Sequence, residues 1–324
     1  MLPVRGGRPK EEAASKQVLV VGAGLMGHGI AQLFAYAGYP VTLTDVSAEA
    51  LAAAPERIRG NLLRMAEQGL ADPERIEPAL RLLRTVGDLE VAARDANFVV
   101  EAVSENLELK QELFRRLDSF CPPEAILATN TSVISITEIA AKAVRQGRIV
   151  GTHFWNPPTL VPLVEVIPGE QTSPETVEST FNLLTEVGKH PVRVKRDVPG
   201  FVGNRLQHAL WREAISIVER GIADADVVDE VVKFGFGIRL PVLGPLETAE
   251  LVGLDLTLAI HDYILKHLEN SPAPSPLLVD KVAKGELGFK TGRGLREWSP
   301  EGAQRVRTDL EAHLFQWVKG HRVS

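Results

Sequence analysis

Short apolar runs and amphipathic stretches alternate along the first two hundred residues of this chain. The runs 18–21 and 41–44 consist mostly of β-branched and other apolar residues, a pattern typical of strands that are buried on both faces. Between these runs, the apolar residues from Ile30 to Ala37 recur at the spacing of one helix face. The pattern therefore predicts a strand, a helix and a second strand of a parallel sheet.

The same alternation continues as far as residue 194. We expect further strands over 96–103, 125–129, 148–153, 163–167 and 192–194, and helices over 47–82, 107–120 and 136–144. Strands that alternate with helices in this way are typical of a doubly wound sheet with helices on both faces. The sequence predicts an α/β fold with an N-terminal Rossmann-type domain.

The pattern changes at residues 196–200, where a proline and a glycine follow the last predicted strand. Beyond this point the apolar spacing is helical, and we expect helices over 201–220, 225–233, 246–268 and 277–284. The predicted organisation is a disordered lead-in over 1–15, a Rossmann domain over 16–198, and an all-helical domain over 199–324.

Composition and charge exclude several classes of protein. The net charge of −6 leaves no excess of basic residues for nucleic acid or an anionic membrane, and no apolar run approaches the ~20 residues of a membrane span. The opening residues lack the apolar core of a secretory signal, and the single cysteine, Cys121, fits a reducing compartment. We expect a cytoplasmic protein.

A glycine-rich turn joins the first strand to the first helix, with the pattern Gly22-x-Gly24-x-x-Gly27. Gly22 permits the tight turn, Gly24 leaves room for a pyrophosphate, and Gly27 lets the helix approach the strand. Asp45 ends the second strand 21 residues after Gly24, where a carboxylate accepts hydrogen bonds from ribose hydroxyls and repels a 2′-phosphate. This context predicts NAD as the cofactor; the alternative is a glycine-rich turn in another kind of α/β protein.

Ligands of a doubly wound sheet bind at the carboxyl ends of its strands. The polar residues at these ends are Asp45, Glu101 to Glu105, Asn130 to Ser132, and His153 to Asn156. His153 is suited to accept a proton near neutral pH, and Glu165, twelve residues on, is a carboxylate among apolar strand residues that needs a partner. The pair predicts a His–Glu dyad; the alternatives are a packed strand-end histidine and an edge-strand glutamate.

Several ordered motifs between about residues 16 and 298 resemble the 3-hydroxyacyl-CoA dehydrogenase family. They are VVGAGLMGHGIAQLFAYAGYPVTLTD, VVEAVSENLELKQELF, ATNTSVISITEI, THFWNPP, LVEVI, DVPGFVGNRL and GELGFKTGRG. The resemblance implies that His153 is the catalytic base, that Glu165 is its partner, and that Ser132 and Asn204 contact the substrate. The cofactor-binding positions that it implies are Gly22, Gly24, Leu25, Met26, Gly27, Asp45, Glu105, Lys110, Asn130, Asn156 and Lys290.

Three departures from the family pattern concern the substrate. Thioester-specific members usually carry a lysine at the position of Pro162, and serine and lysine at the helical positions of Asn61 and Arg64. The turn over 235–247 is also longer than is common in the family, and it contains Arg239. These features resemble relatives that act on free hydroxy acids, such as gulonate and carnitine dehydrogenases. Arg239 is then either a contact for a substrate carboxylate or a solvated loop residue.

The combined interpretation is an NAD-dependent dehydrogenase that oxidises a short-chain L-3-hydroxyacyl-CoA. A free 3-hydroxy acid or small polar alcohol is the alternative substrate, and a non-catalytic NAD-binding protein is a rival from another class. The resemblance and the apolar helices after Pro199 predict a homodimer. Because the histidines show no metal-like spacing with cysteines or acids, we expect no metal site.

Overall fold

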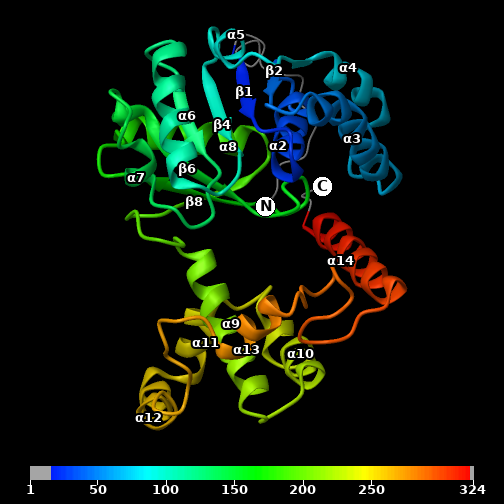
Figure 1. Cartoon of the computed structure of the whole chain (residues 1–324), viewed down its shortest axis with the longest axis vertical. Coiled ribbons are helices and arrows are strands. Elements are labelled where there is room, and N and C mark those ends of the chain that lie inside the picture. The colour runs from blue at the N-terminus through cyan, green and yellow to red at the C-terminus, as the bar shows by residue number, and fades with distance from the viewer. Residues whose placement is uncertain (1–15, 322–324) are drawn as a thin grey trace. The chain divides into compact units, whose positions relative to one another are not determined.

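The computed structural model describes residues 16–321, which form two compact units (Figure 1). The first unit contains residues 16–204 and also residues 311–321, and the second contains residues 205–310. The predicted lead-in over 1–15 lies outside the described residues. We describe each unit by itself.

An eight-stranded sheet in the order β3-β2-β1-β4-β5-β6-β7-β8 forms the centre of the first unit. All neighbouring strands are parallel except β6 and β7, which are antiparallel. The order reverses at β1, as expected of a doubly wound fold, so the predicted Rossmann-type sheet is confirmed. The strands are β1 (Val18–Val21), β2 (Val41–Thr44), β3 (Leu83–Thr85), β4 (Phe98–Glu101), β5 (Ile126–Thr129), β6 (Ile149–Phe154), β7 (Leu163–Pro168) and β8 (His190–Arg193).

Helices cover both faces of this sheet (Figure 1). Successive strand residues point to opposite faces, so Val18 and Val20 enter one apolar core while Leu19 and Val21 enter the other. The first core includes side chains of α2 (Leu25–Tyr36), α3 (Ala48–Glu67) and α8 (Pro174–Glu186). The second core includes side chains of α5 (Leu89–Ala93), α6 (Leu107–Phe120) and α7 (Ile136–Ala140).

The stretch 47–82, predicted as helical, is divided into three helical elements. The helix α3 ends before Gly69, whose φ of 69° is a left-handed conformation that favours glycine. A short turn follows, and then η1 (Pro73–Arg75) and α4 (Ile76–Arg81) return the chain to β3. The result is a helical hairpin whose first arm is α3.

The second unit is helical, as the spacing of apolar residues predicts. It contains most of α9 (Gly203–Glu219), then α10 (Ala225–Phe234), η3 (Phe236–Arg239), α11 (Pro245–Val252), α12 (Leu254–Ile264) and α13 (Pro276–Ala283). The single helix expected over 246–268 is interrupted at Gly253, which has a φ of 104°. Such a conformation cannot continue a helix, so α11 and α12 are separate.

The last helix, α14 (Pro300–Gly320), was not among the predicted elements. Its second half, from Glu311, belongs to the first unit. There Phe315 and Val318 form a small buried cluster with Leu70 and Leu160. The second half of α14 therefore packs against the α3 hairpin of the Rossmann unit.

Candidate active site at the carboxyl ends of the strands

His153 and Glu165 lie directly opposite each other on the antiparallel strands β6 and β7. The Nδ1 atom of His153 is 2.8 Å from Oε2 of Glu165, and the two residues are 5% and 1% exposed. Side chains of directly paired residues point to the same face of a sheet, so the strand register itself brings them together. The structure thus places the two residues of the predicted dyad within hydrogen-bonding distance.

The other carboxylate oxygen of Glu165 accepts two backbone hydrogen bonds. The N–H groups of Val202 and Gly203 each donate to Oε1 at 3.0 Å. These donors lie at the start of α9, where free N–H groups carry partial positive charge. Burial raises the pKa of Glu165, but the hydrogen bonds from His153, Gly203 and Val202 outweigh this effect and hold the pKa below its ordinary value.

An ionised Glu165 fixes the protonation pattern of the histidine ring. A carboxylate without a proton accepts only, so Nδ1 of His153 must carry the hydrogen that is shared with Glu165. In the neutral ring the lone pair is then on Nε2, on the opposite side from Glu165. The arrangement therefore presents Nε2 as a proton acceptor.

Two aromatic rings pack beside the imidazole of His153. The ring centroids of Trp155 and Phe201 lie 5.3 and 5.8 Å from that of the histidine. Phe201 is buried and has a φ of 51°, a conformation that is rare for a bulky side chain and that turns the chain into α9. Apolar rings on the histidine reduce the access of water to the dyad.

Asn204 and Ser132 are joined by a hydrogen bond, with Nδ2 of Asn204 donating to the Ser132 carbonyl at 2.7 Å. Asn204 is buried, whereas Ser132 is exposed. The residues before Ser132 are also tied to the dyad strand, because Oδ1 of Asn130 accepts from the N–H of Phe154 at 2.9 Å. Hydrogen bonds thus connect the loop after β5 with both β6 and α9.

Glu105 is hydrogen-bonded to the loop that contains Ser132. Its Oε1 accepts hydrogen bonds from Oγ1 of Thr131 at 2.6 Å and from the N–H groups of Ser132 and Val133 at 2.8 and 3.1 Å. Partial burial raises the pKa of Glu105, but these hydrogen bonds and the ammonium group of Lys110 outweigh burial and lower it. Sequence reasoning assigned Glu105 to the cofactor and missed its contacts with the Ser132 loop.

Lys110 is fully buried and does not reach open solvent. Its Nζ donates to Oε1 of Glu101 at 2.6 Å and lies 3.4 Å from Oε2 of Glu105. Glu101 also accepts a hydrogen bond from Oγ1 of Thr129 at 2.6 Å. The buried charges of Lys110 and Glu101 are therefore paired. The hydrogen bond from Thr129 to Glu101 connects the ends of β5 and β4.

The glycine turn has the geometry that a bound dinucleotide requires. A Cβ on Gly22 would lie 2.6 Å from the Ala102 carbonyl oxygen, and a Cβ on Gly27 would lie 1.7 Å from the carbonyl oxygen of Gly22. A Cβ on Gly24, in contrast, would point into open space. Gly22 and Gly27 are thus required for packing, whereas Gly24 borders free space in front of the α2 N-terminus, where a pyrophosphate fits.

Asp45 lies beside the glycine turn, directly after the end of β2. Its Oδ2 accepts from the N–H of Ala23 at 2.6 Å, and its Oδ1 accepts from the N–H of Ser47 at 2.8 Å. A cavity of about 360 Å³ lies beside it, with Gly22, Gly24 and Arg116 among its lining residues. The residues present therefore fit the adenosine half of NAD, with Leu25 and Met26 following in the first turn of α2.

Lys189 was not recognised from the sequence. It is buried, and its Nζ donates to the carbonyl oxygens of Val161, at 2.8 Å, and of Pro158. Both acceptors belong to the loop that follows His153 and carries the exposed Asn156. Burial lowers the pKa of Lys189 to about 7. No sequence motif marks this residue, because its partners are backbone atoms.

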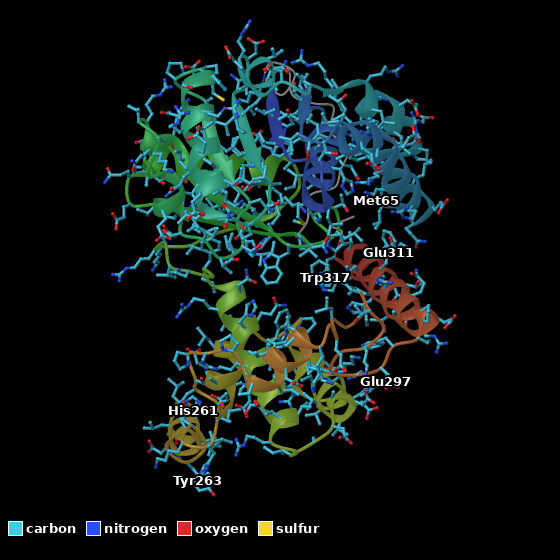
Figure 2. The ribbon with its side chains drawn as sticks, in the orientation of Figure 1. Met65, His261, Tyr263, Glu297, Glu311 and Trp317 are labelled. Carbon is cyan, nitrogen blue, oxygen red and sulfur yellow. The ribbon has the colours of Figure 1, made fainter. Side chains whose placement is uncertain are left out.

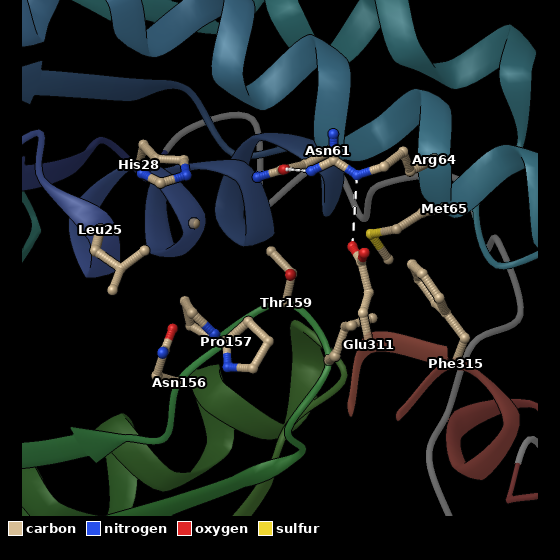
Figure 3. Close-up of a pocket in the computed structure, with 13 residues that line it drawn as sticks. Leu25, His28, Asn61, Arg64, Met65, Asn156, Pro157, Thr159, Glu311 and Phe315 are labelled. Carbon is tan, nitrogen blue, oxygen red and sulfur yellow. Dashed lines mark hydrogen bonds and ion pairs between the residues drawn. The ribbon is translucent and has the colours of Figure 1, made fainter. Parts of the chain in front are cut away.

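The predicted substrate positions Asn61 and Arg64 lie on α3 and line a second cavity (Figure 3). Arg64 donates to Oδ1 of Asn61, and its Nε is 3.5 Å from Oε1 of Glu311 on α14. Leu25 and His28 of α2 and the 156–160 loop form the other walls. The ring of His28 points back along α2, and its Nδ1 lies 2.7 Å from the carbonyl oxygen of Gly24.

Two predicted site residues belong to the second unit. Lys290 is exposed and lines a cavity with Lys281, Glu286 and Trp298, and Arg239 is exposed at the end of η3. The proposed roles of Lys290 in cofactor binding and of Arg239 in substrate binding therefore stay predictions. Within residues 16–321, no helix has the length and apolar character of a membrane span, and no three potential ligand side chains are grouped as a metal ion would require.

Comparison with known proteins extends over nearly all of the chain. The NAD-binding domain of 3-hydroxyacyl-CoA dehydrogenase matches residues 17–198, and the C-terminal domain of the same family matches residues 200–298. A probable 3-hydroxybutyryl-CoA dehydrogenase from Bacillus subtilis is 42% identical over 284 residues, which are 87% of this chain and 97% of the relative.

Two crystal structures extend the comparison. That of 5-formyl-3-hydroxy-2-methylpyridine 4-carboxylic acid 5-dehydrogenase is 32% identical and covers 95% of this chain and 99% of its own, with a TM-score of 0.87. That of (S)-3-hydroxybutyryl-CoA dehydrogenase from Ralstonia eutropha is 34% identical and covers 88% of this chain and 100% of its own, with a TM-score of 0.74. The chain belongs to the 3-hydroxyacyl-CoA dehydrogenase family and is an NAD-dependent dehydrogenase that acts on CH–OH groups.

Proposed function

We propose that this protein oxidises the hydroxyl group of an L-3-hydroxy substrate by means of the His153–Glu165 dyad. Nε2 of His153 removes the hydroxyl proton, and the neighbouring carbon loses a hydride as the carbonyl forms. Bound NAD supplies the hydride acceptor. The observation that carries the proposal is the 2.8 Å contact between Nδ1 of His153 and Glu165, which leaves Nε2 as the base.

Glu165 stabilises the imidazolium that this proton transfer produces. Its ionised state is supported by the N–H groups of Val202 and Gly203, so the positive ring always faces a negative partner. The buried setting of both residues strengthens their attraction. Glu165 acts through His153 and therefore contributes less to the rate than the base itself.

Ser132 and Asn204 hold the reacting oxygen in this proposal. Their mutual hydrogen bond and the support from Glu105 restrict the movement of the Ser132 loop. An exposed hydroxyl on a fixed loop can donate to the substrate oxygen and place it near Nε2 of His153. This positioning supports hydride loss from a single face of the carbon.

Two substrate classes are candidates. The Bacillus relative, by its 42% identity, supports a short-chain 3-hydroxyacyl-CoA such as 3-hydroxybutyryl-CoA. The pyridine-carboxylic acid dehydrogenase, which covers 95% of this chain, is named for a small free acid and supports a substrate without CoA instead. In the first case Asn61 and Arg64 contact CoA; in the second, Arg239 is the candidate contact for a free carboxylate.

A cytoplasmic homodimer is part of the same proposal. Helices of the second unit expose large apolar side chains, among them Leu246, Leu251 and Tyr263, which are 80%, 72% and 74% exposed (Tyr263 is labelled in Figure 2). So much exposed apolar surface supports association with a second copy. The single buried cysteine, Cys121, agrees with a reducing compartment.

The test is NADH formation with a panel of CoA thioesters and free hydroxy compounds. The unmodified protein should oxidise at least one member of the panel, and His153→Gln should lower kcat on it by roughly 10²–10⁴-fold while NAD still binds. Full activity of His153→Gln would refute the proposed base.

A further inference from the structure

The cavity lined by Asn61 and Arg64 has one wall made by the second half of α14 (Figure 3). Asn156 and Pro157, which follow the dyad strand β6, form the wall opposite α3, and Leu25 of the cofactor helix closes a side. Glu311 and Phe315 of α14 line the remaining side. The cavity thus lies between the cofactor turn and α14, and its volume is about 150 Å³.

Apolar packing and two polar contacts hold the second half of α14 in this place. Phe315 and Val318 are buried against Leu70 and Leu160, with Met65 at the edge of the cluster. Figure 2 shows Met65 of α3 facing the part of α14 that carries Glu311 and Trp317. Such packing favours a fixed element rather than a segment that opens freely.

One polar contact lies at the cavity, and the other lies at the C-terminal end of α3. Glu311 lies 3.5 Å from Arg64, and Nζ of Lys319 donates to Oε1 of Gln68 at 2.8 Å. Arg64 also donates to Asn61, so its guanidinium group is shared between two partners of this chain. Glu311 therefore offsets part of the positive charge that would meet a phosphate, and Glu311 itself would repel a phosphate.

The small size of the cavity also argues against CoA binding there. Sites that enclose a drug-sized ligand usually measure roughly 300–1,000 Å³, and the pantetheine and nucleotide of CoA are at least as large. The space between α3, the 156–160 loop and α14 is about 150 Å³, which is below this range. The match to the family's C-terminal domain ends at residue 298, before α14, whereas the structure of the pyridine-carboxylic acid dehydrogenase covers 95% of this chain.

We infer that α14 is a fixed cover that excludes CoA thioesters and selects a small free hydroxy compound. The inference rests on the proposed function, because it concerns the substrate that reaches the His153–Glu165 dyad. Phe315 and Glu311 are the residues that set the selection. Phe315 fills space, and Glu311 offsets part of the charge of Arg64 and repels phosphate. A substrate without a nucleotide does not meet either barrier.

Binding of CoA itself tests the cover without any assumption about catalysis. Titration calorimetry should show CoA binding at least tenfold more tightly to the full-length double variant Glu311→Gln, Phe315→Ala than to the unmodified protein. These two substitutions keep most of α14 in place. Gln316→Ala, on the exposed side of the same helix, is the control and should leave CoA affinity unchanged.

Activity measurements complete the test. The unmodified protein should have a higher kcat/KM for free 3-hydroxybutyrate or small hydroxymethyl aromatic acids than for 3-hydroxybutyryl-CoA, and the double variant should move this ratio toward the thioester by at least tenfold. NAD affinity reports that each variant is folded. If the full chain prefers the thioester, or if the folded double variant leaves both CoA affinity and the ratio unchanged, the cover is refuted.

The outcomes separate this inference from the proposed function. If His153→Gln is fully active on the best substrate, the dyad mechanism fails, whereas a gain in CoA affinity in the Glu311→Gln, Phe315→Ala variant still supports the cover. If His153→Gln is inactive and the full chain prefers 3-hydroxybutyryl-CoA, the mechanism stands and the cover fails.

Discussion

Glu165 is hydrogen-bonded to the backbone of Gly203, whose N–H donates to Oε1 at 3.0 Å while Oε2 faces His153. The first turn of α9 is therefore attached directly to the dyad. The space at this junction is filled: a Cβ on Gly203 would lie 2.4 Å from a ring carbon of Trp155 and 3.2 Å from Oε2 of Glu165. Any side chain at residue 203 must displace the tryptophan or the carboxylate.

We expect Gly203→Ala to lower kcat by about 10- to 100-fold while NAD affinity changes little. A shift of even ~1 Å in Glu165 misorients His153, and displacements of this size cost up to about 10² in rate. The overpacked site should also lose about 1–3 kcal/mol of unfolding free energy. Steady-state kinetics and urea denaturation measure both effects.

Gly320→Ala is a suitable control for that variant, because a Cβ at residue 320 meets no atom within 4 Å. It should leave kcat and the unfolding free energy nearly unchanged. Normal activity of Gly203→Ala would show that the α9 turn does not position Glu165.

The sheet and its strand-end residues could be predicted from the sequence for a physical reason. Buried parallel strands are continuous apolar runs, and their carboxyl ends share one edge, so the polar residues that follow them meet. This pattern identified Asp45, Asn130 and His153 as candidate site residues. Glu165 was recognised because a lone carboxylate in an apolar strand needs a partner. The fold class and the family that these patterns indicated are confirmed.

Other parts of the site could not be predicted, because they depend on backbone atoms. The N–H donors of Val202 and Gly203 and the carbonyl acceptors of Lys189 have no side-chain signature. The helix α14, in contrast, has a signal that was overlooked. Val306, Leu310, Leu314 and Trp317 recur every three or four residues, which is the spacing of an apolar helix face.

The proposed His153–Glu165 dyad predicts different effects for its single and double variants. His153→Gln keeps much of the side-chain volume but cannot take the proton, so kcat should fall by roughly 10²–10⁴-fold with NAD affinity nearly unchanged. Glu165→Gln should cost less. Without the carboxylate the imidazolium is less stable, so the acid limb of the kcat/KM profile should move to lower pH.

The double variant decides whether the two residues act as a unit. It should be little worse than His153→Gln alone, because both residues serve one proton transfer. Losses that multiply in the double variant would show that Glu165 does not act through His153.

Asp45 should determine the choice of cofactor. Its carboxylate would repel a 2′-phosphate at the end of β2, so we expect NAD to bind at least tenfold more tightly than NADP. Asp45→Ala should narrow this difference, mainly by weakening NAD binding. It should also remove the hydrogen bond to the N–H of Ala23. Titration of the protein with both cofactors measures the ratio, and equal affinities in the unmodified protein would contradict this role.

Association through the second unit is testable in solution. Light scattering at micromolar concentration should give twice the mass of the chain. Tyr263→Asp places a charge among the exposed apolar residues of α12 and should shift the protein toward a monomer, whereas Glu90→Gln on α5 should not. A monomeric unmodified protein would contradict the proposed dimer.

The last prediction concerns Lys189, which binds the carbonyl oxygens of Pro158 and Val161 in the loop after His153. A neutral amine keeps two N–H donors, so both hydrogen bonds persist when the proton is lost. Lys189→Met has a similar length but no donor, and it leaves two buried carbonyl groups unsatisfied. We expect a loss of about 1–3 kcal/mol per group in unfolding free energy, with a higher KM for NAD because Asn156 lies on the same loop.

The pH dependence of this loss has a definite sign. Burial lowers the pKa of Lys189 from 10.5 to about 7, so between these values the unfolded chain binds the proton that the folded chain has released. The unfolding free energy of the unmodified protein, relative to Lys189→Met, should therefore rise with pH in this interval, by at most about 1.4 kcal/mol per pH unit. The added stability is complete above 10.5 and is lost as the pH falls toward 7. Urea denaturation of both proteins at several pH values measures the difference, and a difference independent of pH would show that Lys189 keeps its proton when buried.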